Sequence, residues 1–165
     1  KIAIMQGVLT AAASAYQMKG LDNVLSKNPQ MKVVSNQAAD WDATKARSIM
    51  ATVLQQHPDL CGGVGFWDVM DVGTGAAIRE ANKKVYWSPQ GGGTQAACDN
   101  LNKDLYSEVV SYDVPAQARD IANIIQSLFQ NKPKPGATKT TLFSPLTFIN
   151  KDNMKPGACW TLEKK

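Results

Sequence analysis

Short apolar runs alternate along the chain with segments in which apolar residues recur every three to four positions. The apolar runs lie at 2–5, 31–35, 63–66, 85–88 and 108–112. The intervening segments have the periodicity of amphipathic helices, as in the face made by Ala46, Met50 and Val53. This order predicts an α/β fold, with a parallel sheet and helices on both faces, because crossovers between parallel strands are right-handed.

The last part of the chain departs from this alternation. A helical run at 116–129 is followed by 130–136, which is a loop by its content of Asn, Lys, Pro and Gly. Two short extended stretches, 138–143 and 146–149, precede a tail rich in Lys, Pro and Gly. These stretches could form an edge hairpin of the same domain, or they could cross between two lobes.

Composition is that of a folded domain and narrows the classes of function. The chain has 165 residues, 44% hydrophobic and 19% charged, and its net charge is +4. The positive charges are scattered and no recognition motif is present, so we expect no nucleic-acid partner. The single histidine, His57, has no cysteine or carboxylate cluster around it in the sequence, which argues against a metal site. No nucleophile–base pair is apparent either, which argues against an enzyme.

Aromatic, amide and carboxylate side chains follow the predicted strands, where open α/β sheets bind their ligands. In strand order they are Gln6 and Gln17; Asn36, Gln37, Asp40, Trp41 and Asp42; Trp67 and Asp68; Ser88 and Gln90; Tyr112 and Asp113. Sugars and polyols bind to such sets, because their C–H faces stack on aromatic rings and their hydroxyls bond to amides and carboxylates. The positions therefore indicate a site for a hydroxylated small molecule.

Each of these features also has a structural interpretation. Trp41 could be a half-buried aromatic side chain at a helix start, and Asp40 and Asp42 could be helix caps. The glycines at 91–93 lack the lysine and the spacing of phosphate-binding loops, so we interpret them as a tight turn. The methionines at core spacing are expected to pack in the interior.

The string NQAADWDATKA at 36–46, followed by HPD at 57–59, resembles the ribose-type periplasmic sugar-binding proteins. In that family an Asp–aromatic–Asp turn precedes a helix that ends at such an HPD. The segment LTFINKDN at 146–153 resembles the closing segment of the family, and 1–7 its preceding strand. The effector domains of related repressors share these motifs. The resemblance implies one lobe of a two-lobed periplasmic-binding-protein fold, with no cofactor.

The resemblance also implies how the chain is divided. Residues 1–112 would form the C-terminal lobe. Residues 113–150 would contain the hinge crossings and a helix that belongs to the N-terminal lobe, and 151–165 would return to the C-terminal lobe. The N-terminal lobe would be missing, which agrees with a chain that starts at Lys1 directly in an apolar run.

Carried over residue by residue, the ligand contacts of the family fall on six positions. Trp41 takes the place of the stacking aromatic residue. Gln17 stands where the family has an arginine, and Trp67 stands where it has an asparagine; both departures favour a ligand other than ribose. The implied set is Gln17, Trp41, Trp67, Asp68, Gln90 and Asp113.

The resemblance implies a non-catalytic function, the binding of a sugar or polyol as the solute-binding component of an ABC importer. The protein would be periplasmic or extracellular, with the membrane permease as its partner. The alternative is the effector-binding domain of a sugar-responsive transcriptional regulator in a reducing compartment.

The three cysteines, Cys61, Cys98 and Cys159, separate these alternatives. All three could be buried and reduced, or one disulfide could form, which would favour an exported protein. In the family the tail returns to the C-terminal lobe, and this implies that Cys159 pairs with Cys98. Cys61, before the third strand, is then expected to be buried and free.

Overall fold

A strand–helix alternation runs through the chain, in agreement with its apolar pattern. The computed structural model describes residues 1–137, 139 and 141–161. Its elements are β1 (Ile2–Gln6), α1 (Ala12–Leu25), β2 (Val33–Ala38), α2 (Ala43–Gln56), β3 (Gly62–Gly65), α3 (Asp71–Glu80), β4 (Tyr86–Gly91), α4 (Gln95–Asn102), β5 (Val109–Ser111), α5 (Val114–Asn131) and β6 (Thr147–Ile149). The predicted α/β class is confirmed.

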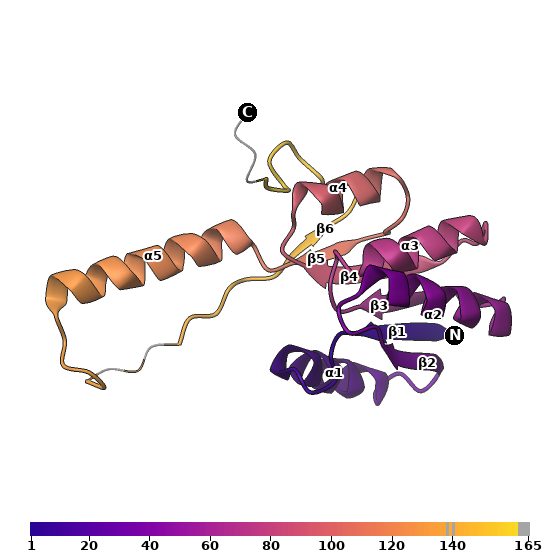
Figure 1. Cartoon of the computed structure of the whole chain (residues 1–165), viewed down its shortest axis with the longest axis horizontal. Coiled ribbons are helices and arrows are strands. Elements are labelled where there is room, and N and C mark those ends of the chain that lie inside the picture. Colours follow the sequence, from indigo (N-terminus) through magenta and orange to yellow (C-terminus); the bar gives the residue numbers. More distant parts are fainter. Residues whose placement is uncertain (138, 140, 162–165) are drawn as a thin grey trace.

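The strands form one sheet in the order β2-β1-β3-β4-β5-β6. All neighbouring pairs from β2 to β5 are parallel, and β6 is antiparallel to β5. The step from β1 to β2 goes toward one edge of the sheet, and the steps from β2 through β3 and β4 to β5 go toward the opposite edge. Right-handed crossovers therefore place α1 on one face and α2, α3 and α4 on the other (Figure 1).

The core lies between the sheet and the face covered by α2, α3 and α4. Its members include Ala3, Met5, Ala46, Met50, Val53, Leu54, Met70, Ala77, Ile78, Trp87, Ala97, Leu101 and Val109. Of the four methionines expected in the interior, Met5, Met50 and Met70 are fully buried, whereas Met18, on α1, is only partly buried. On the opposite face α1 stands alone, so its predicted apolar face is only partly covered and Val24 is exposed.

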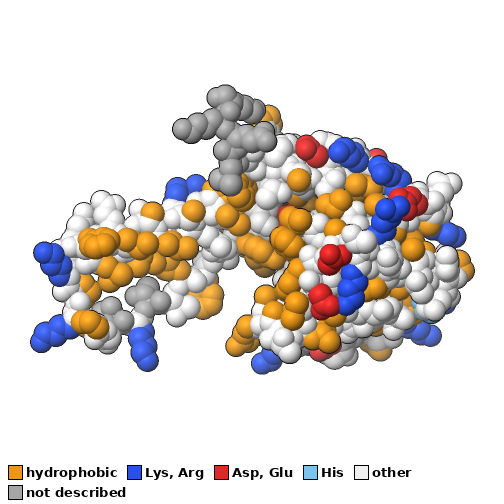
Figure 2. Space-filling view, in the orientation of Figure 1, with side chains coloured by type: hydrophobic (Ala, Val, Ile, Leu, Met, Phe, Trp, Pro, Cys, Tyr) orange, Lys and Arg blue, Asp and Glu red, His pale blue; other side chains and the backbone are white. Residues whose placement is uncertain are grey.

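The long helix α5 projects from the sheet, and the chain returns from its far end to β6 (Figure 1). No residue of α5 is buried, and Phe129 is 76% exposed. Figure 2 shows hydrophobic side chains gathered along this helix. The stretch predicted at 138–143 lies partly outside the described residues, and its described residues form no strand. The antiparallel neighbour of β5 at this edge of the sheet is β6, and the described residues of 138–143 do not pair with it.

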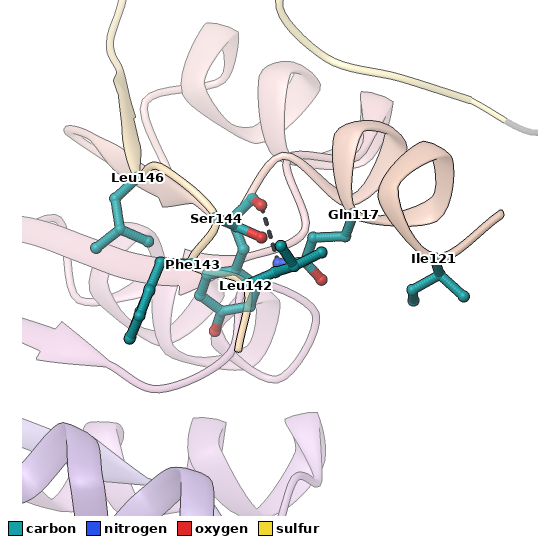
Figure 3. A pocket seen from close by; sticks show the side chains of 7 residues that line it. Gln117, Ile121, Leu142, Phe143, Ser144 and Leu146 are labelled. Atoms are coloured by element: carbon teal, nitrogen blue, oxygen red, sulfur yellow. Dashed lines mark hydrogen bonds between the residues drawn. The ribbon is translucent and has the colours of Figure 1, made fainter. Parts of the chain in front are cut away.

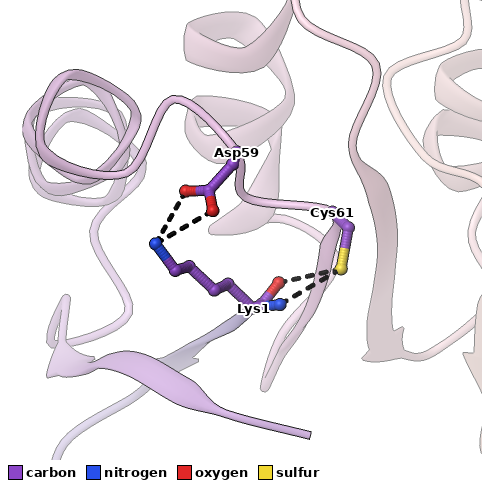
Figure 4. Close-up of polar contacts among 3 residues, drawn as sticks. All are labelled: Lys1, Asp59 and Cys61. Carbon is purple, nitrogen blue, oxygen red and sulfur yellow. Dashed lines mark hydrogen bonds and ion pairs between the residues drawn. The ribbon is translucent and has the colours of Figure 1, made fainter.

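The three cysteines divide into one disulfide and one free thiol. Cys98 and Cys159 are bonded, with their Cα atoms 6.1 Å apart, so the tail is tied to α4. Cys61 is free, but it is exposed, and the prediction that it is buried is wrong. The physical reason is its position at the amino edge of the sheet. There its Sγ donates to the carbonyl oxygen of Lys1 at 3.0 Å, beside the Lys1–Asp59 ion pair (Figure 4).

Among the residues that the structure describes, no helix has both the length and the apolar character needed to cross a membrane.

Candidate ligand-binding site

Three aromatic side chains line an open cavity of about 340 Å³ at the carboxyl edge of the sheet, namely Trp41, Trp67 and Tyr112. Trp41 follows β2, Trp67 follows β3 and Tyr112 follows β5, so the ends of three parallel strands bring them together. The two indoles meet edge to face, with ring centroids 6.2 Å apart and planes at 86°. The arrangement presents aromatic faces to an entering ligand.

The turn before α2 determines where Trp41 lies. Asp40 and Trp41 both have positive φ angles, 54° and 64°, a conformation that costs free energy in residues other than glycine. Asp42 stabilises the turn as the N-cap of α2, since its carboxylate accepts from the backbone N–H of Lys45 at 2.7 Å. Asp40 forms an ion pair with the side chain of the same lysine. Asp42 is therefore a helix cap, whereas Asp40 pairs with a lysine side chain and is not the N-cap of α2.

The indole of Trp41 lies directly over Gly7, the residue that follows β1. A Cβ atom added at Gly7 would be only 2.1 Å from the indole ring. A glycine is therefore required there for the ring to occupy its observed position.

Side-chain amides border the aromatic cavity. The Nε2 of Gln17 donates to Oε1 of Gln90 at 3.2 Å and to the hydroxyl of Tyr112 at 3.4 Å. The Oε1 of Gln17 is buried and has no hydrogen-bond partner among the described residues, which leaves an unsatisfied acceptor on the amide that bonds to Tyr112. Burial raises the pKa of Tyr112 to about 12, so its hydroxyl stays protonated at neutral pH.

Asp68 follows Trp67 but lies inside the protein. Its side chain is 3% exposed, does not line the aromatic cavity, and faces Gly91, where an added Cβ would be 2.0 Å from its Cγ. Burial raises the pKa of this carboxyl, and the backbone N–H groups of Val69 and Gly93 lower it. In this structure Asp68 is a buried carboxyl beside Gly91, and its expected contact with a ligand stays a prediction.

Asp113 is also separated from the aromatic cavity. It has a positive φ of 50° and caps α5, where its carboxylate accepts from the N–H of Ala116 at 3.2 Å. It lines a different cavity of about 350 Å³, together with Arg119 and Trp160. Of the six expected residues, Trp41 and Trp67 line the aromatic cavity, and Gln17 and Gln90 border it through the hydrogen bonds of Gln17 to Gln90 and Tyr112. Asp68 and Asp113 are not among its lining residues.

Tyr112 is the functional candidate that was missing from the expected contacts. It also lines a groove of about 460 Å³ beside α5, with Gln117, Ile121, Leu142, Phe143, Ser144 and Leu146 (Figure 3). Gln117 bonds to the carbonyl oxygen of Tyr112 at 3.1 Å, so the groove and the aromatic cavity share this residue. Its place at the end of the fifth apolar run, 108–112, was the sequence signal for it.

Other positions named from the sequence support the site indirectly. Asn36 and Gln37 lie within β2, which extends further than its apolar run, and Gln6 donates to Oδ1 of Asn36 at 2.6 Å. Within residues 1–137, 139 and 141–161, no group of three or more His, Cys, Asp or Glu side chains could hold a metal ion.

Comparison with known proteins finds one family model and several relatives that match this chain. The family model described as "Periplasmic binding protein domain" matches residues 1–133. The D-apiose import binding protein of Paraburkholderia graminis is 40% identical over 70 residues, which are 42% of this chain and 22% of that protein. The D-allose-binding periplasmic protein of Escherichia coli is 31% identical over 83 residues, 50% of this chain and 27% of that protein.

Solved structures share the fold at low identity. A periplasmic solute-binding protein of an ABC transporter from Actinobacillus succinogenes, with bound D-allose, has a TM-score of 0.79 and 20% identity. The match covers 92% of this chain and 53% of that chain. A solute-binding protein from Bacillus halodurans with bound myo-inositol has a TM-score of 0.77 and 21% identity, over 92% of this chain and 52% of that chain. The chain thus spans about half the length of these solved proteins, and its matches cover about a quarter of the curated relatives.

Proposed function

The chain belongs to the periplasmic binding protein family, and on this premise we propose that it binds a sugar or polyol as the solute-binding component of an ABC importer. The observation that carries the proposal is the aromatic cavity of Trp41, Trp67 and Tyr112, bordered by the amides of Gln17 and Gln90. Stacking faces and amide groups match the C–H faces and hydroxyls of such ligands. Binding would leave the ligand chemically unchanged.

Two observations favour an importer component over the alternative, the effector domain of a regulator. The curated relatives include import binding proteins, and the disulfide between Cys98 and Cys159 suits an oxidising compartment. We therefore propose a periplasmic or extracellular location, with the membrane permease of the importer as partner.

The proposed two-lobed organisation is supported by the exposed face of α5. Residues 1–112 would be the C-terminal lobe, 113–150 the hinge crossings with a helix of the other lobe, and 151–165 the returning tail. Large apolar side chains line α5 on its exposed side: Ile121, Ile124, Ile125, Leu128 and Phe129. Each gains about 1.5–3 kcal/mol on full burial, so an N-terminal lobe that covers them would be stabilised. Closure of two lobes would then enclose the ligand.

The ligand is proposed to differ from ribose in shape or substitution. Gln17 and Trp67 replace the arginine and asparagine of the ribose-type pattern, which gives a pocket with fewer charges and more aromatic surface. D-Allose, D-apiose, D-ribose, xylitol and myo-inositol are the natural probes, because relatives or fold neighbours carry these names.

The test is titration calorimetry, with tryptophan fluorescence as a second signal, of these five probes on the 165-residue chain and on a two-lobed protein containing it. We expect tight binding of at least one probe to the two-lobed protein and weak or undetectable binding to the chain alone. Trp41→Ala should weaken binding by about 1–3 kcal/mol, as expected for a buried aromatic anchor. The matched control is Tyr86→Ala, an exposed aromatic at the amino end of β4, which should leave the Kd unchanged.

Failure of every probe to bind the two-lobed protein would contradict the proposed function. An unchanged Kd for Trp41→Ala would remove Trp41 from the site. Equal affinity of the chain alone and the two-lobed protein would show that a second lobe contributes no contacts.

A further inference from the structure

Four consecutive backbone carbonyl groups, at residues 90–93, accept hydrogen bonds from two different parts of the chain. The first two bond to residues at the aromatic cavity, and the last two bond to the C-terminal tail. The carbonyl oxygen of Gln90 accepts from the N–H of Asp68 at 2.7 Å, and that of Gly91 accepts from the N–H of Tyr112 at 2.9 Å. The first bond holds the turn that carries Trp67. The second holds Tyr112 itself. The segment 90–91 thus fixes two of the three aromatic residues of the cavity from behind.

The next two carbonyl groups are bound by one residue of the tail, Trp160. Its indole Nε1 donates to the carbonyl oxygen of Gly92 at 2.7 Å, and its backbone N–H donates to that of Gly93 at 3.1 Å. In return, the backbone N–H of Gln95 donates to the carbonyl oxygen of Trp160 at 2.7 Å. Trp160 therefore binds the segment 92–95 through both its side chain and its backbone.

The segment has little room to move independently of these bonds. Gly93 has a φ of +69°, and a Cβ added there would be 2.3 Å from Oγ of Ser111. Gly91 is packed as closely against the carboxylate of Asp68. The residue before Trp160 is Cys159, whose disulfide to Cys98 anchors the tail on α4. A displacement of 92–93 would consequently be transmitted to 90–91.

We propose that Trp160 is a positioning residue for the aromatic cavity: by holding the carbonyl groups of Gly92 and Gly93 it fixes the segment that orients Trp67, Gln90 and Tyr112. Trp160 lines the cavity beside Asp113 and is not among the residues that line the aromatic cavity, so it would act through the segment and not by touching the ligand. Its effect on ligand affinity rests on the proposed function of the aromatic cavity.

The first test measures amide hydrogen exchange by NMR in the 165-residue chain. The reporters are the N–H groups of Asp68 and Tyr112. The references are those of Ala39, which bonds to Gln6 at the end of β1, and of Tyr86 at the amino end of β4, which bonds to Cys61. Trp160→Phe removes the indole donor but keeps an aromatic ring, and should speed exchange at the reporters about fivefold, the equivalent of one net hydrogen bond. Trp160→Ala also removes the ring and should speed it at least about tenfold.

The references should be unchanged in both variants, and Lys155→Ala, an exposed tail substitution, should change no amide. Equal acceleration at reporters and references would show that Trp160 merely stabilises the whole domain, and would overturn the proposal. Unchanged exchange rates at the reporter amides would overturn the proposal as well. If Trp160→Ala does not fold, Trp160→Phe still tests the proposal.

The second test titrates the same variants in the two-lobed protein with D-allose, D-apiose, D-ribose, xylitol and myo-inositol. We expect the Kd of any bound probe to rise in Trp160→Phe and to rise further in Trp160→Ala. An unchanged Kd with faster reporter amides would overturn the effect on affinity. If no probe binds even the unsubstituted protein, the proposed function fails, while the exchange result still decides whether Trp160 positions the cavity residues.

Discussion

The indole Nε1 of Trp87 donates a hydrogen bond of 3.0 Å to Oδ1 of Asp71, and both side chains are completely buried. The bond joins β4 to the first turn of α3, directly beneath the turn that carries Trp67. The other carboxylate oxygen, Oδ2, has no hydrogen-bond partner among the described residues. A Cβ at Gly65 would be 1.6 Å from it, so glycine at that position makes room for the buried acid.

This buried acid should make stability depend on pH. Burial raises the pKa of Asp71 from 3.8 to about 7, although the hydrogen bond from the Trp87 indole acts in the opposite direction. Between these two pH values the folded state holds a proton that the unfolded state has lost. The stabilisation by protonated Asp71 is therefore complete below about pH 4 and is lost as the pH rises toward 7. Over this range the free energy of unfolding falls by at most about 1.4 kcal/mol per pH unit on account of Asp71.

Denaturant unfolding at a series of pH values checks this sign, with Asp71→Asn as the comparison. The asparagine keeps an acceptor for Trp87 and cannot ionise, so its free energy of unfolding should fall less steeply from pH 4 to 7. Some slope should remain, because burial also raises the pKa of Asp68. A parent chain whose stability rises over this range would contradict the buried, protonated Asp71.

Two glycine substitutions should differ in their effect on ligand affinity. Gly7→Ala places a methyl group against the indole of Trp41 and should displace the ring, which raises the Kd for the sugar in the two-lobed protein and shifts the tryptophan emission. Gly20→Ala is the matched control, since nothing lies within 4 Å of its added Cβ. In the interior of α1 it should stabilise the chain by about 0.5–1 kcal/mol and leave affinity unchanged. Equal affinity in the two variants would show that the position of the Trp41 ring is immaterial.

The N-cap of α2 should contribute measurably to the free energy of unfolding. Asp42→Ala removes the acceptor for the N–H of Lys45 and should lower the free energy of unfolding by about 1 kcal/mol. Asp42→Asn should retain most of this stabilisation, because asparagine is an equally good N-cap. Asp22→Ala, at an exposed position in α1, should change stability by less than about 0.5 kcal/mol. A loss in Asp22→Ala as large as in Asp42→Ala would contradict a specific capping effect.

Cysteine chemistry should follow the observed exposure. In the native chain a thiol-alkylating reagent should modify Cys61 alone, because it is the exposed free cysteine. Digestion without reductant should yield a linked peptide containing Cys98 and Cys159. Mass spectrometry distinguishes the outcomes, and three alkylated thiols, or a linkage that involves Cys61, would refute the pairing and would favour a cytoplasmic regulator.

Local sequence determined the elements of this fold and the edge at which its site lies. Strand-length apolar runs and helical periodicity are short-range properties, so the alternation from β1 to β5 and the N-cap at Asp42 follow from residues a few positions apart. The carboxyl ends of parallel strands meet at one edge of a sheet, so the order of the strands along the chain is enough to group the strand-end residues Trp41, Trp67 and Gln90.

Only the tertiary structure decided which of these side chains face the cavity. The positive φ angles at Asp40 and Trp41 turn one indole over Gly7, while Asp68, next to a cavity residue, is directed into the interior. Such directions depend on backbone dihedrals and on packing against distant segments, which periodicity does not encode. The same holds for Trp160, which reaches Gly92 across 68 residues of sequence because a disulfide and a parallel bridge return the tail to α4.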